Sequence, residues 1–106
     1  MKTRKAFGLA LRKVRVARGL TQEDFGIISS RTYVSSLERG QKSPTIDKLD
    51  DLAAVLQVHP VALLAIAHAS SQSQAAAVLL LRRLAVDLES LTGLTPSESD
   101  DDILAQ

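Results

Sequence analysis

The chain has 106 residues, 45% of them hydrophobic and 24% charged, a length that suits one domain or one small domain with an appendage. It holds no cysteine, which excludes a disulfide framework, a thiolate metal site and a thiol nucleophile. Residues 1–42 carry ten Lys/Arg and three acids (10 − 3 = +7), whereas residues 43–106 carry three Lys/Arg and nine acids (3 − 9 = −6). The basic first part favours a polyanion partner. The alternative is that the charges merely segregate on a solvated surface.

No part of the sequence looks like a targeting or membrane segment. Charges interrupt the opening MKTRKAFGLALRKVR throughout, unlike the apolar core of a signal peptide. The longest apolar run, AAAVLLL at 75–81, is far too short to cross a bilayer. We therefore expect a soluble, cytoplasmic protein with no membrane partner.

The spacing of apolar residues is helical everywhere, and no segment alternates with period two for long enough to predict a strand. The fold class is therefore predicted to be all-α. The first helix is expected over about residues 3–18 and ends at Gly19. Three apolar side chains line one face of it, with Arg15 at the margin: Phe7, Leu11 and Val14.

A second helix is predicted over about residues 21–28. Thr21 is a suitable N-cap, and Asp24 follows three residues later as an imperfect capping-box partner. The expected buried side chains of this helix are Phe25 and Ile28.

The third predicted helix begins after a turn at Ser29 and Ser30, which supplies its N-cap, and ends at Gly40. In SSRTYVSSLERG, residues 29–40, only three side chains are apolar, so the helix can bury only a narrow edge with Val34 and Leu37 facing inward. Four side chains are expected to face outward: Arg31, Thr32, Ser35 and Ser36.

Two more helices complete a predicted five-helix domain. KSPT at 42–45 breaks the chain, and Thr45 caps a fourth helix. Its expected apolar set is Ile46, Leu49, Leu52, Ala53 and Leu56. A short fifth helix starts at His59-Pro60, where His59 is read as a loop residue rather than a metal ligand. Its apolar residues are Val61, Leu63, Leu64 and Ile66.

The second and third predicted helices have the layout of a helix-turn-helix, whose second helix lies in the major groove of DNA. Arg31 suits bidentate contact with guanine, and Thr32 offers a hydroxyl and a methyl group to phosphate or thymine. Tyr33 is either a core residue or a phosphate ligand through its hydroxyl, and we favour the second.

Three blocks of the sequence also resemble the phage Cro/repressor-type (Xre-like) helix-turn-helix family, over about residues 7–64. They are LTQEDF at the second helix, YVSSLERG in the third and SPTIDKLDDLAAVLQV in the fourth. Together these blocks are specific, whereas any one alone would be weak. The resemblance implies a lambda-repressor-like domain that binds double-stranded DNA and regulates transcription.

The resemblance also implies roles for individual residues. In that family an Arg on the first helix pairs with a Glu near the end of the third; these positions fall on Arg15 and Glu38, to which we assign a structural role. The Gln that grips phosphate falls on Gln22. Base-reading positions fall on Arg31, Thr32 and Ser36, and later phosphate contacts on Arg39 and Lys42. The whole predicted DNA-binding set is Thr21, Gln22, Ser30, Arg31, Thr32, Tyr33, Ser35, Ser36, Arg39 and Lys42.

The turn departs from the family pattern. Gly26 to Val34 spans eight residues where the family has about ten, and the intervening IISS holds no glycine. Either the second helix ends early or the angle between the two helices differs. Both alternatives bear on which side chains reach base edges.

Beyond residue 69 the resemblance ends. SSQS at 70–73 is a polar linker or cap, and a helix is predicted over about 74–91 with Gly93 ending it. Its apolar residues form a heptad-like stripe: Ala77, Leu81, Leu84, Leu88 and Leu91. The stripe predicts a dimer interface, because a monomer on one half-site makes too few contacts for useful specificity. The alternative is a helix folded back on its own domain.

After that helix, TPSE at 95–98 has a capping-box pattern for a last short helix to about Ala105, and ESDDD otherwise suggests an acidic, mobile tail.

These patterns predict a DNA-binding domain over 1–69 and a helical extension over 70–106. The expected function is sequence-specific regulation of transcription, as a dimeric repressor that binds a palindromic operator through residues 31–39 and is associated with the nucleoid when bound. The alternative is an interaction module or antitoxin-like protein that binds an unknown second protein through its C-terminal helix. With no nucleophile–base pair, metal cluster or phosphate loop visible, we expect no enzyme activity, no cofactor and no metal.

Overall fold

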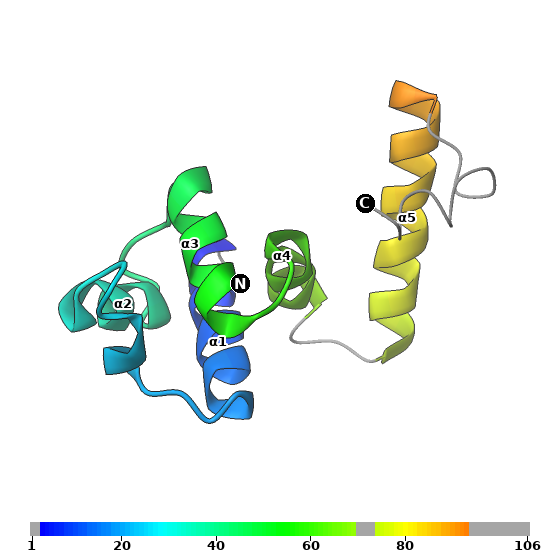
Figure 1. The fold of residues 1–106 in the computed structure, drawn as a ribbon. Coiled ribbons are helices and arrows are strands. Elements are labelled where there is room, and N and C mark those ends of the chain that lie inside the picture. Colours follow the sequence, from blue (N-terminus) through cyan, green and yellow to red (C-terminus); the bar gives the residue numbers. More distant parts are fainter. Residues whose placement is uncertain (1–2, 70–73, 94–106) are drawn as a thin grey trace. The chain divides into compact units, whose positions relative to one another are not determined.

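A computed structural model describes residues 3–69 and 74–93. These residues form helices joined by turns, with no strand among them, in agreement with the predicted all-α class (Figure 1). The chain divides into two compact units, residues 1–71 and 72–106. Within the described ranges no single helix is long and apolar enough to cross a membrane; only the pair Ile46–Leu56 and Pro60–Ala69, bent by 95°, has the length and composition to do so together.

Helix α1, Thr3–Ala17, is the element against which the first unit is assembled. It packs against both α2, Arg31–Glu38, and α4, Pro60–Ala69 (Figure 1). Gly19 follows it at a φ of +71°, the left-handed conformation expected where the helix ends. Its buried face includes the three predicted apolar side chains together with Gly8 and Ala10.

The close approach of α1 to α2 occurs at Gly8. A Cβ added there would lie 2.3 Å from the carbonyl oxygen of Leu37 and 2.7 Å from that of Glu38, and backbone atoms cannot rotate away as a side chain could. We expect Gly8→Ala to destabilise the protein by about 1–3 kcal/mol in urea unfolding, although alanine is the better helix former. Arg12→Ala, at an exposed position of the same helix, is the control. A Gly8→Ala variant as stable as the parent would show that the two helices can separate freely.

The second predicted helix is much shorter than its expected range of 21–28. It is a single 3-10 turn, η1, at Gln22–Phe25. Asp24 is the partner expected for Thr21, since its carboxylate accepts hydrogen bonds from the Thr21 backbone N–H at 2.6 Å and hydroxyl at 3.2 Å. Phe25 is fully buried, whereas Ile28 is only partly buried.

The early end of η1 has a local cause. Gly26 is a poor helix former, and Ser30, the N-cap of α2, has extended backbone with φ −74° and ψ 154°. Only three residues separate these two positions, too few for a second turn of helix. Of the two alternatives that the short turn left open, an early end to the second helix is the one observed.

Helix α2 begins and ends where the sequence predicts. The Ser30 hydroxyl accepts a hydrogen bond from the Tyr33 backbone N–H at 3.1 Å, and Gly40 follows the helix at a φ of +72°. Val34 and Leu37 are fully buried, as expected. The thin apolar edge of this helix therefore anchors it to the core.

Helix α3, Ile46–Leu56, is capped by Thr45, whose hydroxyl accepts a hydrogen bond from the Lys48 backbone N–H at 3.1 Å. Helix α4 starts beside His59, whose Nδ1 accepts a hydrogen bond from the Val61 N–H at 3.0 Å, so His59 is a loop residue at a helix start. The buried side chains of these two helices are Leu49, Leu52, Ala53, Leu56, Leu63 and Ala67.

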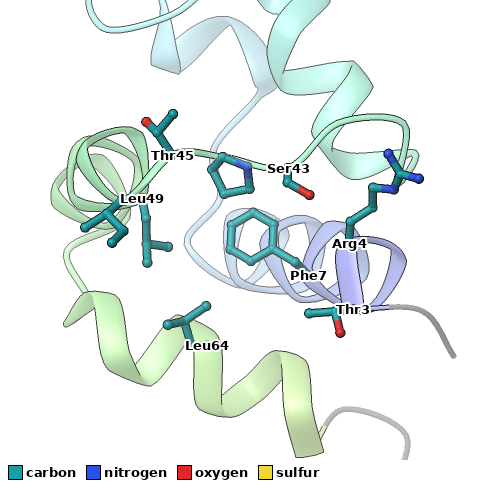
Figure 2. A pocket seen from close by; sticks show the side chains of 9 residues that line it. Thr3, Arg4, Phe7, Ser43, Thr45, Leu49 and Leu64 are labelled. Atoms are coloured by element: carbon teal, nitrogen blue, oxygen red, sulfur yellow. The ribbon is translucent and has the colours of Figure 1, made fainter.

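Three residues of the apolar sets predicted for these helices lie instead at the surface. Ile46 is 80% exposed and Leu64 is 38% exposed. Both border an open cavity of about 270 Å³ between the start of α1, the segment before α3, and helices α3 and α4 (Figure 2). Because Phe7 and Leu49 line the same cavity without filling it, the outer side chains have no opposing surface to bury them. Val61, in the first turn of α4, is also exposed.

Helix α5 of the second unit spans Gln74–Thr92, close to the predicted 74–91, and Gly93 follows at a φ of +74°. An exposed i,i+4 pair, Arg83 Nε to Asp87 Oδ1 at 3.2 Å, lies on it. The leucines of the predicted stripe are 36–82% exposed. The short helix and acidic tail expected after residue 94 lie outside the described residues.

Candidate nucleic-acid interface

A buried ion pair between Arg15 and Glu38 joins α1 to α2. Arg15 donates from Nε to Glu38 Oε2 at 2.6 Å and from Nη2 to Glu38 Oε1 at 3.0 Å, so the contact is bidentate. The side chains are only 13% and 4% exposed. The hydrogen bond to Glu38 and its charge raise the pKa of Arg15 against the opposing effect of burial. The two residues that the sequence predicted as partners therefore lie in contact.

Further hydrogen bonds extend this pair into the turn. Arg15 Nη1 donates to the Leu20 carbonyl at 2.9 Å, which ties the end of α1 to the start of the turn. Gln22 Nε2 donates to Glu38 Oε1 at 3.1 Å, which ties η1 to the end of α2. One carboxylate thus fixes α1, η1 and α2 relative to one another. The Gln22 amide keeps a second N–H with which to contact a ligand.

The outward side of α2 carries fewer residues than predicted. Arg31 and Thr32 are exposed and Ser35 is half-buried. The prediction that Ser36 faces outward is wrong: it is 7% exposed, and its hydroxyl donates to the Thr32 carbonyl at 3.0 Å. A small side chain that satisfies its hydroxyl within its own helix can be buried without leaving a polar group unpaired. Ser36 is thereby removed from the outward face of α2.

The first turn of α2 is the most accessible part of the helix. Arg31 Nη1 lies 3.5 Å from Glu23 Oε1 of η1, and both side chains are about 70% exposed, 69% and 71%. A solvated ion pair of this kind contributes little stability, so Arg31 can exchange the Glu23 carboxylate for another anion. Ser30 and Thr32 flank Arg31 at this end and are also exposed, as is Thr21 at the start of η1.

Three side chains from different elements form what we call the Tyr33 cluster: Tyr33 of α2, Lys42 of the following loop and Lys48 of α3. The ammonium groups of Lys42 and Lys48 each lie 5.7 Å from the centroid of the Tyr33 ring, within cation–π range. Tyr33 is partly buried against the core, so it is both a core residue and part of the surface.

Lys48 is the member of this cluster that sequence reasoning missed. Its ammonium donates a hydrogen bond to the Ile28 carbonyl of the turn, twenty residues earlier. No local pattern marks it, because its place depends on how α3 returns alongside the turn. Arg39, another predicted phosphate ligand, is exposed, and its Nε donates to the Ser35 carbonyl at 3.4 Å.

Comparisons with known proteins agree on one kind of domain. A helix-turn-helix family model matches residues 11–63. The chain is 43% identical over 65 residues to an uncharacterized HTH-type transcriptional regulator, y4dJ, of Sinorhizobium fredii (strain NBRC 101917 / NGR234), a match covering 59% of this chain and 84% of that protein. Among solved structures, the clp gene regulator ClgR from Corynebacterium glutamicum is similar with a TM-score of 0.64 and 28% identity, covering 89% of this chain and 98% of that one.

Proposed function

Since the chain belongs to the helix-turn-helix family, as its Cro/repressor-type sequence blocks indicated, we propose that α2 binds in the major groove of double-stranded DNA. The chain is a DNA-binding transcriptional regulator and not an enzyme. One observation carries the placement of DNA: α2 buries Val34 and Leu37 against the core while its first turn presents Arg31 and Thr32 to solvent. Selection of bound duplexes from a random pool, followed by titration of the enriched sequence, tests this proposal.

Within this interface Arg31 and Thr32 are the base-reading residues. The remaining predicted contacts supply hydroxyl, amide or cationic groups suited to phosphate. These residues are Thr21, Gln22, Ser30, Tyr33, Ser35, Arg39 and Lys42. Ser36 is omitted because it is buried.

Base reading and phosphate binding predict different mutant behaviour. Arg31→Ala should weaken binding to the selected site by roughly 1–3 kcal/mol and relax preference at one base position. Lys42→Ala should weaken selected and random duplexes to a similar degree, because a phosphate contact carries no sequence information. Fluorescence anisotropy on both kinds of duplex measures the difference. Small and equal losses on both duplexes for Arg31→Ala would remove that residue from base reading.

We further propose that the protein acts as a dimeric repressor, with α5 as the dimer interface. The support is the exposure of Leu81, Leu84, Leu88 and Leu91 along one stripe, since such a surface favours burial against a second apolar surface. Two-fold symmetry then gives a palindromic operator whose half-site centres are about 34 Å apart, one helical turn of DNA.

A second candidate function rests on the opposite side of α5. Leu79 and Val86, seven residues apart and off the stripe, are 62% and 59% exposed. A two-stranded seam covers only one face of each helix. This second apolar face favours the alternative in which α5 also binds another protein, as an antitoxin-like regulator would.

A further inference from the structure

The Tyr33 cluster brings two cations to one aromatic ring without an anion to balance them. Lys42 and Lys48 both approach Tyr33 at 5.7 Å. Among the residues that the structure describes, neither lysine has a carboxylate within ion-pair distance; the three ion pairs involve Arg15, Arg31 and Arg83. Each ammonium therefore lies beside the Tyr33 ring with no carboxylate of its own, and its charge is available to an anionic ligand.

Lys48 is held in place before any ligand arrives. Its side chain is partly buried, and one of its three N–H groups donates to the Ile28 carbonyl. That carbonyl lies in the shortened turn between η1 and α2, where no helix continues to supply a backbone N–H that would donate to it. Lys48 therefore ties α3 to this turn and keeps further N–H groups for a second acceptor.

The groups around this point suit a phosphate. Two ammonium groups offer charge, and the Tyr33 hydroxyl offers an additional donor. The cluster also adjoins α2, the helix that the proposed function places in the major groove, where phosphates of the DNA backbone pass on either side of the helix.

We propose that Lys48, together with Lys42 and Tyr33, forms a seat for one backbone phosphate of bound DNA, with Lys48 also fixing the turn that precedes α2. This inference rests on the proposed DNA binding and adds to it a phosphate-binding residue on α3 that is not among the contacts predicted from the sequence. Lys48 acts in two ways: it positions the turn, and it neutralises the phosphate.

Salt dependence separates the second role from a purely structural one. In the 106-residue chain, Lys48→Met keeps the apolar stem but removes the charge. Each phosphate neutralised contributes about −0.9 to the slope of log K against log salt, so the slope should fall in magnitude by about 0.9 and affinity near 0.15 M salt by about fivefold. The loss should be alike on the selected duplex and on random duplexes.

Two further variants serve as controls. Lys48→Arg keeps the charge and donors and should restore the slope. Lys13→Met removes the same charge from an exposed position on the side of α1 that faces α4, lining a groove with Val58 and Ile66, and should leave the slope unchanged. Circular dichroism melting of every variant ensures that the binding measurements are made on folded protein.

The outcomes distinguish this inference from the proposed function. A parent protein with no salt-dependent binding to any duplex would overturn both. A parent that binds, with Lys42→Met lowering the slope and Lys48→Met leaving it unchanged, would overturn the role of Lys48 alone. Weaker binding by Lys48→Met with a lowered melting temperature but an unchanged slope would also overturn it, because Lys48 would then act only on the turn.

Discussion

Glu38→Ala is expected to lower the free energy of unfolding by about 3–5 kcal/mol, because it leaves a mostly buried guanidinium without its carboxylate. The side chain of Glu38 is 4% exposed and accepts both hydrogen bonds of the bidentate contact with Arg15. It also accepts the Gln22 amide hydrogen bond, so its loss leaves donors from two other elements unpaired. Urea unfolding followed by circular dichroism measures the change.

Replacing both partners tests the cause. Arg15→Met combined with Glu38→Leu removes both charges and keeps apolar volume, so it should cost much less than Glu38→Ala alone. Glu23→Ala is the matched control, because Glu23 belongs to the exposed pair with Arg31 and should change stability by less than about 1 kcal/mol. Simple additivity of the Arg15 and Glu38 substitutions in a double-mutant cycle would count against a coupled pair.

The double substitution Leu84→Glu and Leu88→Glu is expected to convert a dimer into a folded monomer. Each leucine moved from water into an interface contributes roughly 1.5–3 kcal/mol, so losing two of them should weaken association by about a hundredfold or more. The monomer should bind the selected operator much more weakly, because it contacts one half-site at a time. Sedimentation velocity and anisotropy measure the two effects.

The opposite face of α5 provides the matched control. The double substitution Leu79→Glu and Val86→Glu should leave the dimer intact if the stripe is the dimer interface. The same substitution should abolish binding of a second protein if that protein docks on the opposite face. Truncation after Ser70 should also give a folded monomer. A truncated chain that unfolds would favour a helix that covers its own domain, whereas a truncated chain that remains dimeric and binds its operator normally would contradict the dimer proposal.

Much of the fold could be predicted because its determinants are local. Caps such as Ser30 and Thr45 act within three residues of themselves, and Gly19 ends its helix through its own backbone conformation. The apolar spacing of α1 fixes which face is buried before any partner is known. These signals gave helix positions close to those observed.

The remaining features depend on contacts between distant segments. Ser36 is buried because α2 packs more broadly than its apolar edge suggests, which its own sequence does not reveal. Ile46 is exposed because the cavity beside Phe7 stays open, a property of four segments together. The place of Lys48 against Ile28 likewise requires that α3 return to the turn. The spacing of residues along the chain does not predict such contacts between distant segments.

Every aromatic residue of the chain lies in the first unit: Phe7, Phe25 and the single tyrosine, Tyr33, with no tryptophan anywhere. Intrinsic emission excited near the tyrosine band therefore originates from one point, beside the turn and the two lysines. Circular dichroism, in contrast, sums over the helices of both units. If the two signals disappear together on heating, the units unfold as one; if they separate, the difference between the curves is the melting of α5 itself. Comparison of these two signals therefore tests whether the two units unfold independently, without any attached label.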